Sequence, residues 1–126
     1  MKKLSPILWT KNLHETISFY EQVLGFRGIT GDFPNFVSLT REEVEIMFIV
    51  PNNEPEEGNE EKFFWKCRIT GNLFIVMQQV DLFWETVKDK ATVKTEIADR
   101  EYMMRDFSIL DNNGYELVFG EHIRKQ

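Results

Sequence analysis

Residues 105–121 read RDFSILDNNGYELVFGE, the stretch that decides the fold of the C-terminal half. Its centre, DNNG at 111–114, tolerates the positive φ of a tight turn, and Asp111 can hydrogen-bond to its own backbone. The stretch therefore predicts a β-hairpin. In the second strand, successive side chains alternate between two faces. One face carries Tyr115, Leu117 and Phe119, and the other carries Glu116, Val118 and Gly120.

The segments before this hairpin complete a βαβββ module. NLFIVMQQ at 72–79 predicts a strand, and Asp81 is expected to cap a short helix that runs to Ala91. Three strands are then expected, near residues 92–97, 105–110 and 115–120.

The first half of the chain follows the same plan. LSPILWT at 4–10 predicts a strand, Asn12 with Glu15 predicts the start of a helix, and Gly25 ends that helix. Extended segments follow at 26–30, 35–40 and 44–50. The helices also share a short match, FYEQV at 19–23 and FWETV at 83–87. A match this short also arises by chance, but the repeated order of elements supports an internal duplication.

These patterns predict an α+β fold in which two tandem βαβββ modules form curled mixed sheets around a cleft. The modules occupy about residues 1–50 and 71–126 of a single domain that spans 1–126. Between them, PNNEPEEGNEEK at 51–62 has five glutamates and two prolines, which is the composition of an acidic linker. Concave sheets lined by side chains are common sites for small ligands.

The composition excludes several classes of partner. The 126 residues carry 15 basic and 21 acidic side chains, a formal charge of −6, and no large basic cluster. Nucleic acid and anionic membranes are therefore not expected as partners. No apolar run approaches the roughly 20 residues that cross a bilayer. Cys67 is the only cysteine, so no internal disulfide can form and the cytoplasm is the expected compartment.

Four motifs carry a resemblance to a known family. They are SPILWTKNLHETISFYEQVLGF at 5–26, EEVEIMFIV at 42–50, VDLFWETVKD at 80–89, and the hairpin at 105–121. In order and spacing, the set resembles the vicinal oxygen chelate superfamily, which includes glyoxalase I, ring-cleaving dioxygenases, fosfomycin-modifying enzymes and bleomycin resistance proteins. The resemblance spans nearly the whole chain and is least at the acidic linker and at KFFWKCRIT (62–70).

The resemblance implies four strand positions that hold one divalent metal in the enzymes of the superfamily. Those positions are occupied here by Ser5, Met47, Asn72 and Val118. Histidine, glutamine and glutamate are the usual ligands there, so the chain is similar to the metal-poor, bleomycin-resistance-like members. We therefore expect no metal and no other cofactor. A displaced metal site would have to use Glu45, Asp106 and Glu116 as its carboxylate donors.

Alternation along the predicted strands assigns the residues that line the cleft. As a set they predict an apolar pocket with several carboxylates, suited to a planar or cationic molecule stacked on Trp9 or Phe74. Arg105 is a further ligand-binding candidate, although it can instead pair with an acidic side chain of its own chain. The histidines, His14 and His122, are expected to be exposed and to lie off the inward strand faces. The lining residues are Ser5, Ile7, Trp9, Glu45, Met47, Ile49, Phe74, Val76, Asp106, Ser108, Glu116 and Val118.

Two functions are the main candidates from the sequence, and a purely structural or regulatory module is a third possibility. The first is a binding protein without a catalytic metal that sequesters an amphipathic or cationic small molecule. The second is a lyase or dioxygenase with a displaced metal site, for which no catalytic residue can be named. The resemblance also implies a homodimer, because the family commonly pairs two chains. Whether each cleft is built from one chain or two stays open.

Overall fold

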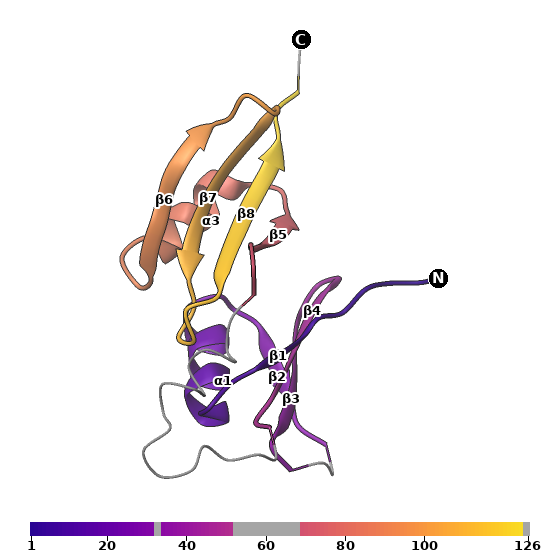
Figure 1. Ribbon diagram of the computed structural model, residues 1–126. Helices are drawn as coiled ribbons and strands as arrows, with labels where there is room; N and C mark the ends of the chain where they lie inside the picture. Colours follow the sequence, from indigo (N-terminus) through magenta and orange to yellow (C-terminus); the bar gives the residue numbers. More distant parts are fainter. Residues whose placement is uncertain (32–33, 52–68, 125–126) are drawn as a thin grey trace. The chain divides into compact units, whose positions relative to one another are not determined.

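The computed structural model describes residues 1–31, 34–51 and 69–124. The chain divides into two compact units, Met1–Arg68 and Ile69–Gln126, and Figure 1 shows one sheet and its helix in each. Beyond Pro51, the predicted acidic linker lies outside the described residues. Within the described ranges, no helix is both long and apolar enough to span a membrane.

The first unit is a βαβββ module, as the sequence predicts. Strand β1 lies parallel to β4, and the other neighbouring strands are antiparallel. Helix α1 (Leu13–Gln22) connects β1 to β2. The sheet has the order β1-β4-β3-β2, formed by β1 (Ile7–Trp9), β2 (Arg27–Ile29), β3 (Phe36–Arg41) and β4 (Val44–Ile49).

Both ends of α1 follow from residues that the sequence singled out. Asn12 has an extended backbone, and its side chain accepts a hydrogen bond from Glu15 N at 3.0 Å. The helix ends at Gln22, and the chain reverses at Gly25, whose φ of +71° favours glycine. Phe26 N then donates to Tyr20 O at 2.9 Å, which satisfies one of the last carbonyls of the helix.

The second unit repeats the topology of the first. Its sheet has the order β5-β8-β7-β6, again with one parallel pair, β5 with β8, at the edge. Helix α3 (Val80–Val87) connects the first two strands. The strands are β5 (Leu73–Val76), β6 (Thr92–Asp99), β7 (Met104–Leu110) and β8 (Glu116–His122). Two tandem βαβββ modules with mixed sheets are therefore confirmed.

Helix α3 differs from its prediction at both ends. It ends at Val87, so the predicted extension to Ala91 is wrong. Asp81 does not cap it, because Asp81 is already inside the first turn and Gln79 occupies the N-cap position. The first N–H groups are instead satisfied by Glu121 of β8, whose carboxylate accepts from Gln79 N at 3.1 Å and from Val80 N at 3.2 Å. A partner 41 residues away in the chain supplies the cap.

The hairpin predicted from DNNG is confirmed. Asp111 Oδ1 accepts hydrogen bonds from Asn113 N and Tyr115 N, both at 2.9 Å, so its side chain organises the turn. Gly114 adopts a φ of +89°. The face of β8 that carries Leu117 and Phe119 faces the helix, as predicted, because Phe119 packs on Phe83 of α3.

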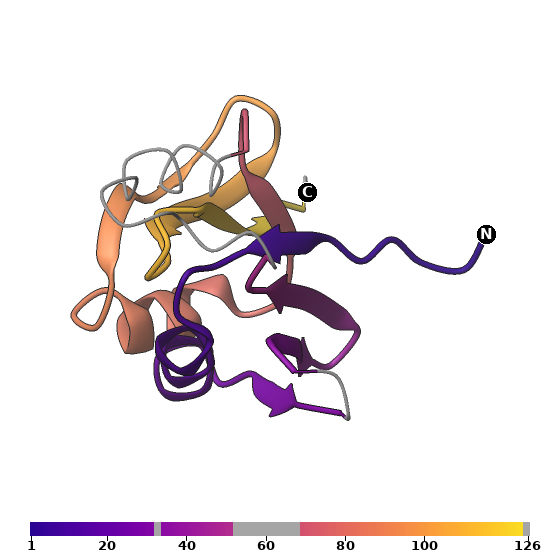
Figure 2. The ribbon, with the colours of Figure 1, turned by 60° about the horizontal axis from the view of Figure 1, so that its bottom comes forward.

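Each unit buries the sheet face that contacts its helix. In the first unit, Tyr20 of α1 packs on Phe48 of β4, with ring centroids 5.2 Å apart. In the second, Phe83 of α3 packs on Phe119 of β8 at 4.9 Å. Figure 2, seen from another side, shows α1 beside the strands of its sheet. The opposite face of each sheet, which we call the helix-free face, is left for other contacts.

Candidate functional site

The helix-free face of the first unit gathers the residues that the sequence assigned to the cleft from this half. Strand register places Ile7 and Ser38 on either side of Met47, and Trp9 beside Ile49. Ile7 is 57% exposed and Trp9 is 37% exposed, although both are large and apolar. The face is formed by Ile7, Trp9, Ser38, Glu45, Met47 and Ile49.

Glu45 is the charged centre of that face. Its carboxylate accepts hydrogen bonds from Ser38 Oγ at 2.5 Å and Ser5 Oγ at 2.7 Å, and Lys3 Nζ lies 3.0 Å away. The hydrogen bonds from Ser38 and Ser5, with Lys3, lower the pKa of Glu45 from 4.5 to about 2. Glu45 is therefore an ionised carboxylate held in one orientation at neutral pH.

The helix-free face of the second unit gathers the other predicted cleft residues. Val118 of β8 lies between Phe74 of β5 and Ser108 of β7. Phe74 is 45% exposed and Val76 is 56% exposed, whereas Ser108 and Val118 are buried. The face is formed by Phe74, Val76, Asp106, Ser108, Glu116 and Val118.

Glu116 on this face has an environment like that of Glu45. Burial acts to raise its pKa, but hydrogen bonds from Ser108, Lys94 and Asn72 outweigh burial, and the pKa is lowered. Lys94 Nζ lies 3.1 Å from the carboxylate. Because the hydroxyl of Ser108 donates its one proton to Glu116, it must accept the hydrogen bond that it shares with Thr95. The hydroxyl of Thr95 thus donates to Ser108, and the hydroxyl of Ser108 donates to the carboxylate of Glu116.

The two carboxylates occupy equivalent places in the two modules. Each lies on the last strand of its module. Glu45 comes two residues before Met47, which pairs with Ser38, and Glu116 comes two residues before Val118, which pairs with Ser108. Each also has one lysine as its ion-pair partner. The sequence does contain a signal for this repeat, VEIMF at 44–48 and YELVF at 115–119, which the sequence analysis missed.

Asp106 lies on the same helix-free face but is bound within its own unit. It is 3% exposed, and its two oxygens accept from Arg100 Nε at 2.9 Å and from Tyr102 Oη at 2.6 Å. The hydrogen bond to Asp106 raises the pKa of Tyr102, because an ionised phenol would lose it. Asp106 thus fixes the turn between β6 and β7.

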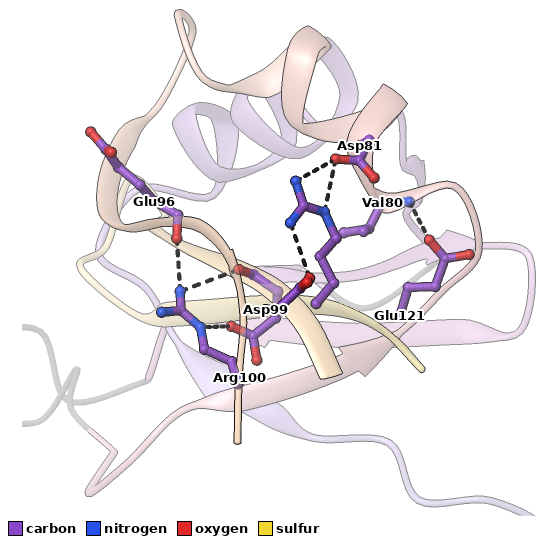
Figure 3. A network of polar contacts seen from close by, with 8 residues as sticks. Val80, Asp81, Glu96, Asp99, Arg100 and Glu121 are labelled. Atoms are coloured by element: carbon purple, nitrogen blue, oxygen red, sulfur yellow. Dashed lines mark hydrogen bonds and ion pairs between the residues drawn. The ribbon is translucent and has the colours of Figure 1, made fainter. Parts of the chain in front are cut away.

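Arg105 lies apart from the other candidates. It projects to the helix side of the second sheet, where its guanidinium bridges Asp81 of α3 and Asp99 of β6 at 2.9 and 3.0 Å. Figure 3 shows Asp81 and Asp99 with the dashed lines that join each of them to the guanidinium group. The hydrogen bonds that Arg105 donates to Asp81 and Asp99 raise the pKa of Arg105. The sequence left two roles open for Arg105, ligand binding and pairing with an acidic side chain of its own chain. In the structure, Arg105 pairs with Asp81 and Asp99.

The residues present do not fit the metal that the enzymes of the family hold. At the four positions that the resemblance implies for metal ligands, the sequence has Ser5, Met47, Asn72 and Val118, none of which is a histidine or a carboxylate. In the described part of the chain, no three His, Cys, Asp or Glu side chains are grouped so that they could hold a metal ion. The three carboxylates that a displaced site would use each pair with a basic side chain: Glu45 with Lys3, Asp106 with Arg100, and Glu116 with Lys94.

Comparison with solved structures shows the same fold in several proteins of low sequence identity. A glyoxalase-related enzyme from Clostridium phytofermentans has 18% identity and a TM-score of 0.72 over 98% of this chain and 96% of its own. A glyoxalase/bleomycin resistance protein/dioxygenase from Alicyclobacillus acidocaldarius has 13% identity and a TM-score of 0.73 over 98% and 96%. TioX from Micromonospora sp. ML1 has 14% identity and a TM-score of 0.74 over 98% and 100%.

Comparison with curated proteins gives no match. A family model, in contrast, matches residues 4–119, nearly the whole sequence. The matched span includes both βαβββ modules up to Phe119 of β8. The chain therefore belongs to the Glyoxalase/Bleomycin resistance protein/Dioxygenase superfamily.

Proposed function

We propose that this protein binds a small amphipathic cation on the helix-free faces of its sheets, without a catalytic metal. The observation that carries the proposal is the repeated carboxylate, Glu45 in one unit and Glu116 in the other. Each is held ionised by hydroxyl donors and a lysine, and each shares its sheet face with an exposed aromatic ring, Trp9 or Phe74.

This combination favours a cation with an apolar body over other small molecules. A carboxylate attracts the positive charge, and the face of an aromatic ring adds a cation–π contact. The apolar remainder of the ligand would cover side chains such as Ile7 and Val76, which are more than half exposed. The formal charge of −6 on the protein also favours the approach of cations.

Calorimetric titration with benzyltrimethylammonium tests the proposal, with uncharged benzyl alcohol as the comparison ligand. We expect saturable binding of the cation and much weaker binding of the alcohol. Glu116→Gln or Glu45→Gln should weaken binding of the cation by about five- to tenfold, because a charge partner is lost. Glu85→Gln is the matched control, since Glu85 is an exposed carboxylate on α3. Equal affinity for the two ligands would contradict the proposal.

The proposal extends to the assembly and the compartment. We infer a cytoplasmic homodimer, because the family commonly pairs two chains and the edge strands β1 and β5 carry exposed apolar side chains. The second candidate function, a lyase or dioxygenase, requires three donors that converge on one metal. The described residues offer no such group, which is why we favour binding over catalysis.

A further inference from the structure

A groove of about 630 Å³ lies in the second unit, at the end of strand β5. It forms because β5 stops at Val76, opposite Gly120, whereas β8 continues to His122. Its volume is within the range of small-molecule sites. The sequence patterns did not predict this groove. Of the residues that line it, Val76 alone was predicted to line the cleft. The groove is lined by Val76, Met77, Gln78, Gln79, Glu121, His122 and Arg124.

The main chain of β8 also faces this groove. Met77 N donates to Gly120 O at 2.8 Å, and Ile123 N donates to Met103 O on the opposite side at 3.0 Å. Alternate residues of a strand direct their N–H and C=O groups to opposite sides. His122 therefore directs its N–H and C=O to the side of Gly120, where β5 has already ended. The sequence predicted His122 to lie off the inward strand faces, but it is the last residue of β8 and pairs with Met104 of β7.

The groove presents a cationic hydrogen-bond donor and no free carboxylate. Its one carboxylate, Glu121, already accepts from Gln79 N and Val80 N, and Figure 3 shows it directed at Val80. Its charge is also offset by the N-terminus of α3. Arg124 is exposed and has no ion pair with any other described residue. The guanidinium of Arg124, the amides of both glutamines and the N–H of His122 are thus available.

We propose that this groove binds a small organic carboxylate. The planar carboxylate matches the fork of donors on Arg124, with further hydrogen bonds from Gln78 and from His122 N. The apolar part of the ligand would lie on Val76 and Met77. An inorganic anion has no apolar part and would make no such contact. Val76 borders both this groove and the helix-free face, but the groove selects the opposite charge, because its preference is set by Arg124 and not by Glu116. The inference therefore does not depend on the proposal for the helix-free faces.

Amide chemical shifts of the full-length ¹⁵N-labelled protein, titrated with sodium benzoate, test this inference. We expect saturable shifts confined to the amides at 76–80 and 120–124. Arg124→Gln should weaken benzoate binding about tenfold, because the charged partner is lost. Arg27→Gln is the matched control, an exposed arginine in β2 of the other unit, and should change nothing. Gln78→Ala is a second variant that should weaken binding in a milder way if Arg124→Gln fails to fold.

Several results would overturn the inference. One is the absence of saturable shifts at millimolar benzoate, and another is an equal loss of affinity in Arg124→Gln and Arg27→Gln. Binding of inorganic phosphate as tight as that of benzoate would assign the groove to inorganic anions instead. Tighter binding of benzylammonium at the same amides would mean that Glu121, rather than Arg124, sets the charge preference. Failure of benzyltrimethylammonium to bind the helix-free faces would leave this inference untouched.

Discussion

The lysine beside each of the two repeated carboxylates, Glu45 and Glu116, has a direct consequence for binding. Lys94 Nζ lies 3.1 Å from Glu116, and the lysine side chain is 55% exposed. A ligand cation must therefore displace an ammonium group that already occupies the same carboxylate. An exposed ion pair is worth about 0.2–1 kcal/mol, so the lysine is a weak competitor.

Removing that competitor should strengthen binding. We expect Lys94→Met to raise the affinity for benzyltrimethylammonium by roughly two- to fivefold, measured by calorimetry. Lys90→Met removes the same charge from an exposed position in the turn after α3 and should leave the affinity unchanged. An equal gain in both variants would instead indicate a general effect of net charge.

The second residue-scale prediction concerns acid pH and Glu45. The pKa of Glu45 is about 2 in the folded chain, against 4.5 as its ordinary value. A lowered pKa stabilises the fold fully above the ordinary value, and that stability is lost as pH falls through the folded pKa. As the pH is lowered from 4.5 to about 2, the unmodified protein should therefore lose free energy of unfolding through Glu45. The loss over the same pH range should be smaller in Glu45→Gln. A carboxyl ¹³C titration of Glu45 with a midpoint near 4.5 would contradict the assignment.

At the level of single residues, the sequence predicted positions better than partners. Alternation placed Glu45, Glu116 and Asp106 on the correct strand faces, because a two-residue period is a local property. It could not predict that Arg100 and Tyr102 take both oxygens of Asp106, since those contacts depend on the turn between two strands. It also left the role of Arg105 open, because the choice depends on how α3 packs.

Helix α3 illustrates an element whose start depends on a distant residue. Gln79, at its N-cap position, has a φ of +59° and makes no side-chain cap, so Glu121 from β8 supplies the acceptors. A cap of this kind cannot be recognised from local sequence signals, which is why Asp81 was chosen wrongly.

Replacing the distant cap should destabilise the second unit. We expect Glu121→Ala to lower the free energy of unfolding by about 1–2 kcal/mol, because the N–H groups of Val80 and of the N-cap residue Gln79 lose their acceptor. Glu85→Ala, on the exposed side of the same helix, should cost less than about 0.5 kcal/mol. Urea denaturation of both variants provides the measurement. Equal effects would show that Glu121 does not stabilise the helix.

The helices also qualify the sequence evidence for duplication. The match between FYEQV and FWETV aligns Phe19 with Phe83, but Tyr20 is the residue whose ring packs on the equivalent phenylalanine of the sheet. The shared letters are therefore one residue out of register with the shared contacts. The duplication is supported far better by the strand order and by the matched carboxylates than by the helix sequence.

At the scale of the whole molecule, the order of elements was predictable and the site was predictable only in part. Turn and cap signals such as DNNG and Asn12 are local, and together with the repeat they were enough to predict two βαβββ modules. The groove beside His122 depends on where β5 stops relative to β8, and no local pattern fixes the relative lengths of two strands that are distant in sequence.

Metal content distinguishes the two functions that the sequence left open. We expect the purified, untagged protein to retain no near-stoichiometric metal after incubation with nickel, zinc, manganese or iron and subsequent dialysis. The physical reason is that Glu45, Asp106 and Glu116 each pair with a basic side chain. Elemental mass spectrometry is the measurement. Retained metal that is lost in Glu116→Gln would instead favour the lyase or dioxygenase.

The last prediction concerns assembly. Sedimentation equilibrium should give a mass of about twice the 15.0 kDa of one chain, because the edge strands β1 and β5 expose Ile7 and Val76 by more than half. A charge at such an edge should weaken association, so Ile7→Glu should shift the equilibrium toward the monomer. Leu82→Glu is the matched control, since Leu82 is an equally exposed leucine on α3, away from the sheet edge. A monomeric unmodified protein would refute the dimer, and loss of the dimer only in Leu82→Glu would move the interface from β1 to the helix.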